Sequence, residues 1–301
     1  MVRFIDSLVR MHALVGVCAV LLVGAALARP GEQPAPAAGA ATADSSPPPP
    51  ELTKNPIPKP KNDTAAAAHR RVPSAVLFGG TCGGSVISER WVLTAAHCTI
   101  FSSADLVVAG TGHSHDDSGV RRSVKRLVVH PRFTVGPYWL RPEDFNITQV
   151  GAHWDFLLAE LDEPLPLDGA NISAVALDDE GYLHHGTLVA YAGYGAAHHG
   201  ETMREEMHLM ELETVDNAAC ASMEQFSSED MFCAKGRPPR FDSACNGDSG
   251  SGLVTQGEGP RRLVGVASWV EDDARECAPG KLVVFSRVSA VRDWINQVTG
   301  I

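Results

Sequence analysis

The chain has 301 residues, of which 44% are hydrophobic and 20% are charged, so most of it can fold as an ordinary globular protein. The formal net charge is −11 and only 6% of the residues are aromatic. An acidic chain without a basic patch is a poor partner for polyanions, so we expect no nucleic-acid binding.

Residues 1–28 have the features of a secretory signal peptide. Arg3 and Arg10 precede an apolar run from Ala13 to Ala28, and the small residues Ala26 and Ala28 suit cleavage after position 28. The apolar run is short for a transmembrane helix, and no later segment is apolar enough to cross a bilayer. We therefore expect a secreted, extracellular protein that has no membrane attachment after the signal is removed.

Residues 29–61 are predicted to be a pro-segment or linker. Half of the chain's 20 prolines lie between Pro30 and Pro60, and such a stretch stays extended and builds no core. From position 62 onward the composition is that of a folded domain, which we expect to extend over residues 62–301.

Within this domain, short apolar and β-branched runs alternate with turn residues. Examples are "WVLTAA", "ADLVVAG", "DFLLAEL", "TLVAYAGYG", "RLVGVASWV" and "KLVVFSRV". This rhythm of short strands predicts an all-β sandwich or barrel. Only residues 289–298 show helical periodicity, with Val291, Trp294, Ile295 and Val298 on one face.

The cysteines indicate an oxidising compartment. Cys18 leaves with the signal peptide, and an even number remains, which in a secreted chain predicts disulfides whose pairing the spacing leaves open. Zinc is the competing use, but the chain has no C-x-x-C pair, and we expect no metal and no cofactor. N-glycosylation sequons start at Asn62, Asn146 and Asn171.

The stretch "SACNGDSGSGL" places Ser249 among small residues, between Asp248 and Gly250. Such a run is either a flexible surface turn or a tight turn that presents a nucleophile beside bare backbone N–H groups. The second interpretation needs a histidine and a carboxylate elsewhere in the chain. His97 follows the apolar run "WVLTAA", and Asp155 precedes the apolar run "FLLAEL", where a carboxylate needs a partner.

The segments "CGGSVISERWVLTAAHC", "DFLLAEL", "GDSGSGL", "SWV" and "FSRVSAVRDWI" together resemble the chymotrypsin/trypsin family of serine peptidases, in the family's order. The resemblance implies two packed six-stranded antiparallel β-barrels, a C-terminal helix and a site between the barrels. It implies a serine endopeptidase in which Ser249 is the nucleophile, His97 the general base and Asp155 the residue that orients His97. The N–H groups of Gly247 and Ser249 would form the oxyanion hole.

The same resemblance implies further assignments. The disulfides would be Cys82–Cys98, Cys220–Cys233 and Cys245–Cys277, and Ser268 and Trp269 would bind the substrate backbone as an added strand. The partners would be protein or peptide substrates and protein inhibitors of the enzyme. We expect a monomer.

Substrate preference is read from the predicted primary pocket. Ser243 falls at its base and is neutral, whereas Val270 and Val283 fall on its walls, where the family usually has glycine. Two valines narrow the pocket, so we expect cleavage after small apolar residues, as in elastases. The alternative is a trypsin-like preference, in which a shifted loop brings Asp242 into the pocket.

One departure from the family concerns activation of the zymogen. Family members are usually switched on when cleavage frees an Ile-Val-Gly-Gly terminus, whose amine pairs with the acid before the serine, here Asp248. This chain lacks that motif, and Pro60, Lys61, Asn62 and Asp63 stand in its place. Either another group satisfies Asp248 or the oxyanion hole is poorly formed. The alternative function is therefore a catalytically weak or silent homologue that acts as a binding protein.

Overall fold

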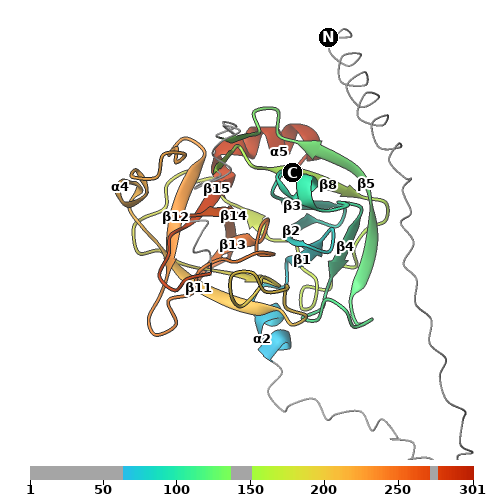
Figure 1. Cartoon of the computed structure of the whole chain (residues 1–301). Helices are drawn as coiled ribbons and strands as arrows, with labels where there is room; N and C mark the ends of the chain where they lie inside the picture. The colour runs from blue at the N-terminus through green and yellow to red at the C-terminus, as the bar shows by residue number, and fades with distance from the viewer. Residues whose placement is uncertain (1–63, 137–150, 272–276) are drawn as a thin grey trace, which may run out of the picture. The chain divides into compact units, whose positions relative to one another are not determined.

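The computed structural model describes residues 64–136, 151–271 and 277–301. Most of its regular structure is antiparallel strand, arranged as two barrels (Figure 1). The predicted signal peptide and pro-segment, and the sequons at Asn62 and Asn146, lie outside the described residues and stay predictions. None of the helices in these ranges is long and apolar enough to span a lipid bilayer.

The first barrel closes through six strands in the order β1-β2-β3-β8-β5-β4, and β4 pairs back with β1. Its strands are β1 (Ala75–Phe78), β2 (Cys82–Ser88), β3 (Trp91–Thr94), β4 (Leu106–Ala109), β5 (Val120–Val129) and β8 (Leu157–Leu161). Every residue of β1 and β3 is buried, which explains why these strands read as continuous apolar runs and not as alternating ones.

The second barrel closes in the order β13-β10-β11-β12-β15-β14, through a pairing of β13 with β14. Its strands are β10 (Leu188–Gly193), β11 (His208–Thr214), β12 (Met231–Gly236), β13 (Gly252–Thr255), β14 (Arg262–Val270) and β15 (Val283–Arg287). A short β9 (Ala176–Leu177) adds to β14 in parallel. The hairpin of β6 (Thr134–Gly136) and β7 (Gly151–His153) forms a separate two-stranded sheet.

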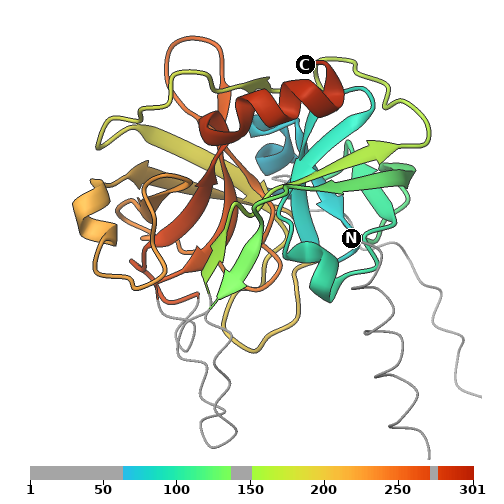
Figure 2. The same cartoon turned by 90° about the horizontal axis from the view of Figure 1, so that it is seen from above.

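The C-terminal helix forms where the periodicity predicts it. A 3₁₀ turn, η2 (Val288–Val291), leads into α5 (Arg292–Thr299), which Figure 2 shows beside the barrels. Val291 and Ile295 are buried in a core cluster shared with the first barrel, and Trp294 meets the ring of His130 edge-on at 4.8 Å. The expected fold class, two six-stranded antiparallel barrels with a C-terminal helix, is confirmed.

The expectation of a single helix is wrong. The structure also contains α2 (Thr64–Arg71) and two one-turn helices, α3 (Cys98–Phe101) and α4 (Asn217–Cys220). Helix α2 has the sequence TAAAAHRR, and alanine has the highest helix propensity of all residues. Its apolar side chains are too small and too few to produce a clear periodic pattern, so the periodicity test does not detect it.

The cysteines pair as the resemblance implies: Cys82–Cys98, Cys220–Cys233 and Cys245–Cys277. Asn171, the one predicted sequon within the described residues, is exposed, and its side-chain amide donates to Asp168 Oδ2 at 2.8 Å.

Candidate active site

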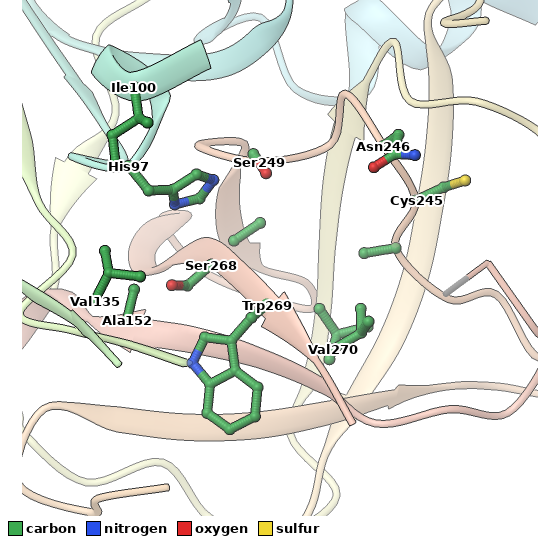
Figure 3. A pocket seen from close by; sticks show the side chains of 13 residues that line it. His97, Ile100, Val135, Ala152, Cys245, Asn246, Ser249, Ser268, Trp269 and Val270 are labelled. Carbon is green, nitrogen blue, oxygen red and sulfur yellow. The ribbon is translucent and has the colours of Figure 1, made fainter. Parts of the chain in front are cut away.

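A cavity of about 280 Å³ brings together residues that are far apart in the sequence (Figure 3). His97 borders it from the first barrel, immediately before α3, and Ser249 borders it from the turn before β13. The edge of strand β14 forms another wall through Ser268, Trp269 and Val270. His97 and Ser249, two of the residues predicted to act together, therefore border one cavity.

His97 and Asp155 form a buried pair. The His97 N–H donates to Asp155 Oδ1 at 2.9 Å, and His97 Nδ1 lies 2.6 Å from Asp155 Oδ2. The Asp155 side chain is completely buried and that of His97 is 13% exposed. A proton on Nδ1 is held by the carboxylate, which leaves Nε2 of the neutral ring as the atom that can accept a proton.

A hydrogen bond to the distant residue Asp230 holds the backbone turn that precedes Asp155. Asp155 lies two residues before β8, and the preceding Trp154 adopts a left-handed conformation with φ of 51°. The Trp154 N–H donates to the buried carboxylate of Asp230 at 2.7 Å. This bond holds an unusual turn, and the turn aims Asp155 at His97.

The charges of the pair reinforce each other. Burial disfavours the imidazolium form of His97, but the negative charge of Asp155 and its hydrogen bond outweigh this, so the pKa of His97 is raised. Burial likewise disfavours the carboxylate of Asp155, but the charge of His97 and three hydrogen bonds lower its pKa. The lowered pKa favours the carboxylate form of Asp155, which stabilises positive charge on the imidazole.

Ser268 has a role that the sequence did not reveal. Its hydroxyl donates to Asp155 Oδ2 at 2.5 Å, so it helps to hold the carboxylate. A register shift between Ala267 and Trp269 leaves Ser268 without a partner in β15. The bulge directs this hydroxyl to Asp155, and no feature of the "SWV" motif indicates it.

The Ser249 segment is tied to the His97 segment by a hydrogen bond and a disulfide. The N–H of Gly83 donates to the Ser249 carbonyl at 2.7 Å, and the neighbouring Cys82 is bonded to Cys98, the residue after His97. A side chain at Gly83 would collide with Ser251, so the close approach of the two segments requires glycine here.

The Gly247 and Ser249 N–H groups, which are predicted to form the oxyanion hole, donate to no protein acceptor among the described residues. Gly247 has a φ of +97°, a conformation that favours glycine, and a Cβ there would lie 2.7 Å from the Met203 side chain.

Val270 and Val283 lie on the wall of the same cavity. They are direct cross-strand partners in the antiparallel pair β14–β15, and both are buried. Ala244 and Ala267 contribute further apolar lining that sequence reasoning did not identify.

Ser243 and Asp242 are not brought into this cavity. Both border a neighbouring one, beside Arg240 and Cys277. Ser243 is buried with its hydroxyl unpartnered, and Asp242 forms a 2.8 Å ion pair with Arg240. The expectation that Ser243 forms the base of the specificity pocket is therefore wrong for this cavity, whose lining on this segment begins at Ala244.

Comparisons with known proteins agree with this architecture. The family model "Trypsin" matches residues 61–295. The chain is 58% identical to Scolexin B of Heliothis virescens over 244 residues, 81% of each chain, and 33% identical to human chymotrypsin-like elastase family member 1 over 225 residues, 72% of this chain and 81% of the relative. Among solved structures, mouse neuropsin superimposes with a TM-score of 0.61 at 24% identity, covering 76% of this chain and 95% of neuropsin.

The fold, the cavity and these similarities define a class, the peptidases built on two β-barrels. The chain belongs to the trypsin family, and it is a serine endopeptidase that acts on protein or peptide substrates.

Proposed function

We propose that the protein is a secreted endopeptidase that cleaves peptide bonds through a covalent acyl-enzyme, with Ser249 as nucleophile, His97 as general base and Asp155 as its orienting anion. The observation that carries this proposal is the 2.6 Å contact between His97 Nδ1 and Asp155 Oδ2 in a cavity that Ser249 also borders. The chemistry needs no metal or cofactor.

In the first step, Ser249 Oγ attacks the carbonyl carbon of the scissile bond while its proton passes to His97 Nε2. The carbonyl oxygen becomes an oxyanion, which accepts hydrogen bonds from the Gly247 and Ser249 N–H groups. The tetrahedral intermediate collapses, the C–N bond breaks, and His97 gives its proton to the leaving amine. Water then attacks the acyl-enzyme in the same way, and Ser249 recovers its proton.

Each residue of the site lowers the energy of a charge that forms during the reaction. Asp155 stabilises the imidazolium of His97 and so raises the pKa of His97. The raised pKa makes the imidazole a stronger base toward the proton of Ser249. The oxyanion donors act on a charge that the ground state lacks, and losing one such donor typically lowers the rate by about 10²–10³.

The shape of the cavity supports a preference for small apolar residues before the scissile bond. Val270 and Val283 occupy space that a long substrate side chain would need, and the lining includes no acidic side chain among the described residues. The trypsin-like alternative is weakened, because Asp242 lies in the neighbouring cavity and its charge is neutralised by Arg240.

The bulge at Ser268 supports the predicted binding of the substrate backbone along β14. A substrate in extended form would add to this edge and place its side chain against Val270 and Val283. We further propose that the mature protein is a monomer, that protein inhibitors bind at the same cleft, and that the exposed Asn171 is a glycosylation site.

The test is hydrolysis of a peptide series that differs only in the residue before the scissile bond: alanine, valine, leucine, phenylalanine or lysine. The secreted protein, with its amino terminus sequenced, is compared with Ser249→Ala. We expect cleavage after alanine and valine by the wild type alone. Preferred cleavage after lysine would overturn the specificity, and no cleavage at all would favour a binding protein that uses this fold.

A further inference from the structure

Asp248, next to the proposed nucleophile, is a buried carboxyl group that the reaction does not use. Its side chain is 1% exposed. The Gly195 N–H donates to Oδ1 at 3.2 Å, and the Cys245 N–H donates to Oδ2 at 3.0 Å. Two backbone donors hold the carboxylate, but they carry no full positive charge, and a buried carboxylate without a countercharge is costly.

His208 lies at the same carboxylate. His208 Nε2 is 3.7 Å from Asp248 Oδ1, and the His208 side chain is 15% exposed. Within the described part of the chain, it is the one basic side chain that forms an ion pair with Asp248. The sequence has no Ile-Val-Gly-Gly motif from which cleavage could bring an amine here, and His208 is a basic side chain that already lies at this carboxyl group.

The local backbone is shaped for this contact. His208 begins β11 and is the cross-strand partner of Gly193 in β10. A Cβ at Gly193 would lie 2.6 Å from Asp248 Oδ1, and a Cβ at Gly195 would lie 2.2 Å from Oδ2. The carboxylate can therefore reach the imidazole only because both positions are glycine.

The contact is connected to the oxyanion donors. The Asp248 N–H donates to the Cys245 carbonyl at 2.9 Å, and the Ala196 N–H donates to the Asn246 carbonyl at 2.8 Å, so this turn is held on both sides of Gly247. Releasing Asp248 would free the middle of the turn, where the Gly247 and Ser249 N–H groups are located.

We infer that His208 is a positioning residue, which pairs with Asp248 inside the protein and so holds the Gly247–Ser249 turn in the conformation that forms the oxyanion hole. This inference rests on the proposed function, because it assigns His208 a role in the same reaction. Burial raises the pKa of Asp248, against the opposing charge of His208. Burial also lowers the pKa of His208, against the opposing charge of Asp248.

The surroundings of His208 permit a chemical test. It borders two cavities, so a small molecule can reach the space that its side chain occupies. The charged and titratable groups around the pair are Tyr191 of β10, Arg204 before β11, and the ion-paired Arg240 and Asp242.

The experiment measures kcat and KM for a small-residue peptide with the wild type, His208→Ala and the matched control His185→Ala, an exposed loop histidine. We expect His208→Ala to lower kcat by about 10², with KM changed less than about threefold, because oxyanion stabilisation acts on the transition state. Added imidazole should restore part of kcat in His208→Ala and have no such effect on His185→Ala.

A second variant keeps the test decisive if His208→Ala does not fold. His208→Leu fills the space without a nitrogen, so it should lose kcat equally and resist rescue by imidazole. An active wild type with an unchanged kcat in a folded His208 variant would overturn this inference and leave the proposed function standing. An inactive wild type would overturn the proposed function, and this inference with it.

Discussion

Shortening Val283 should widen the specificity pocket in a predictable way. Val283 is fully buried, borders the cavity, and faces Val270 across the β14–β15 pair. Val283→Ala removes two methyl groups from the wall, so a substrate leucine can bury about two more carbons than in the wild type.

The magnitude follows from the burial of those carbons. Each buried CH₂ group contributes about 0.8 kcal/mol, so two contribute about 1.6 kcal/mol. Since about 1.4 kcal/mol is a factor of ten, Val283→Ala should raise the kcat/KM ratio of leucine to alanine peptides by about 15-fold. The cavity formed in the free enzyme should also cost stability, by about 2 kcal/mol.

The assay compares kcat/KM for the two peptides in the wild type, Val283→Ala and Val284→Ala. Val284 is equally buried, but adjacent residues of a strand face opposite sides, and Val284 packs in another core cluster. Val284→Ala should therefore lose similar stability and keep the wild-type ratio. An unchanged ratio in Val283→Ala, or an equal shift in both variants, would refute the pocket assignment.

Three other outcomes are expected. Asp155→Asn should lower kcat by about 10⁴, as in trypsin-type triads, with an unchanged circular dichroism spectrum; a loss below tenfold would contradict its orienting role. Because Asp155 raises the pKa of His97, kcat/KM should fall with decreasing pH through a midpoint above about 6.5, the pKa of a free histidine. The same pairing should contribute its full free energy of unfolding below about pH 6.5, and this contribution should decline as pH rises through the raised pKa of His97. Replacing Cys82 and Cys98 by alanine removes a disulfide of sequence separation 16, which should lower Tm by about 6–12 °C and also reduce kcat. The matched control replaces Cys220 and Cys233, of separation 13, and should lower Tm without reducing kcat.

Ser249, His97 and Asp155 could be proposed as a triad because five separate segments resemble one family in the family's order. Their immediate neighbours alone left the run around Ser249 open as a flexible surface turn. The two-barrel fold could be predicted from the short strands and their resemblance to one family. The resemblance implies that Val270 and Val283 are two walls of the primary pocket, and the β14–β15 register, in which they are direct cross-strand partners, explains why both border the same cavity.

The positions of Ser268, Ser243 and His208 could not be predicted, because they depend on tertiary geometry that no local sequence pattern encodes. The bond from Ser268 to Asp155 occurs at a bulge, and Ser243 borders the neighbouring cavity. His208 lies 40 positions before Asp248 and belongs to no motif. The one sequence signal for it was indirect, namely a buried acid whose usual amine partner is missing from the chain.

The most direct test of the account is the reactivity of Ser249. The folded, disulfide-bonded protein is treated with a fluorophosphonate probe, the labelled residue is located by mass spectrometry, and Ser249→Ala serves as control. We predict a single phosphonylated residue, Ser249, in the wild type and none in the variant. A wild type that stays unlabelled, or that is labelled at another residue, would contradict the proposal that His97, Asp155 and Ser249 form a working catalytic triad.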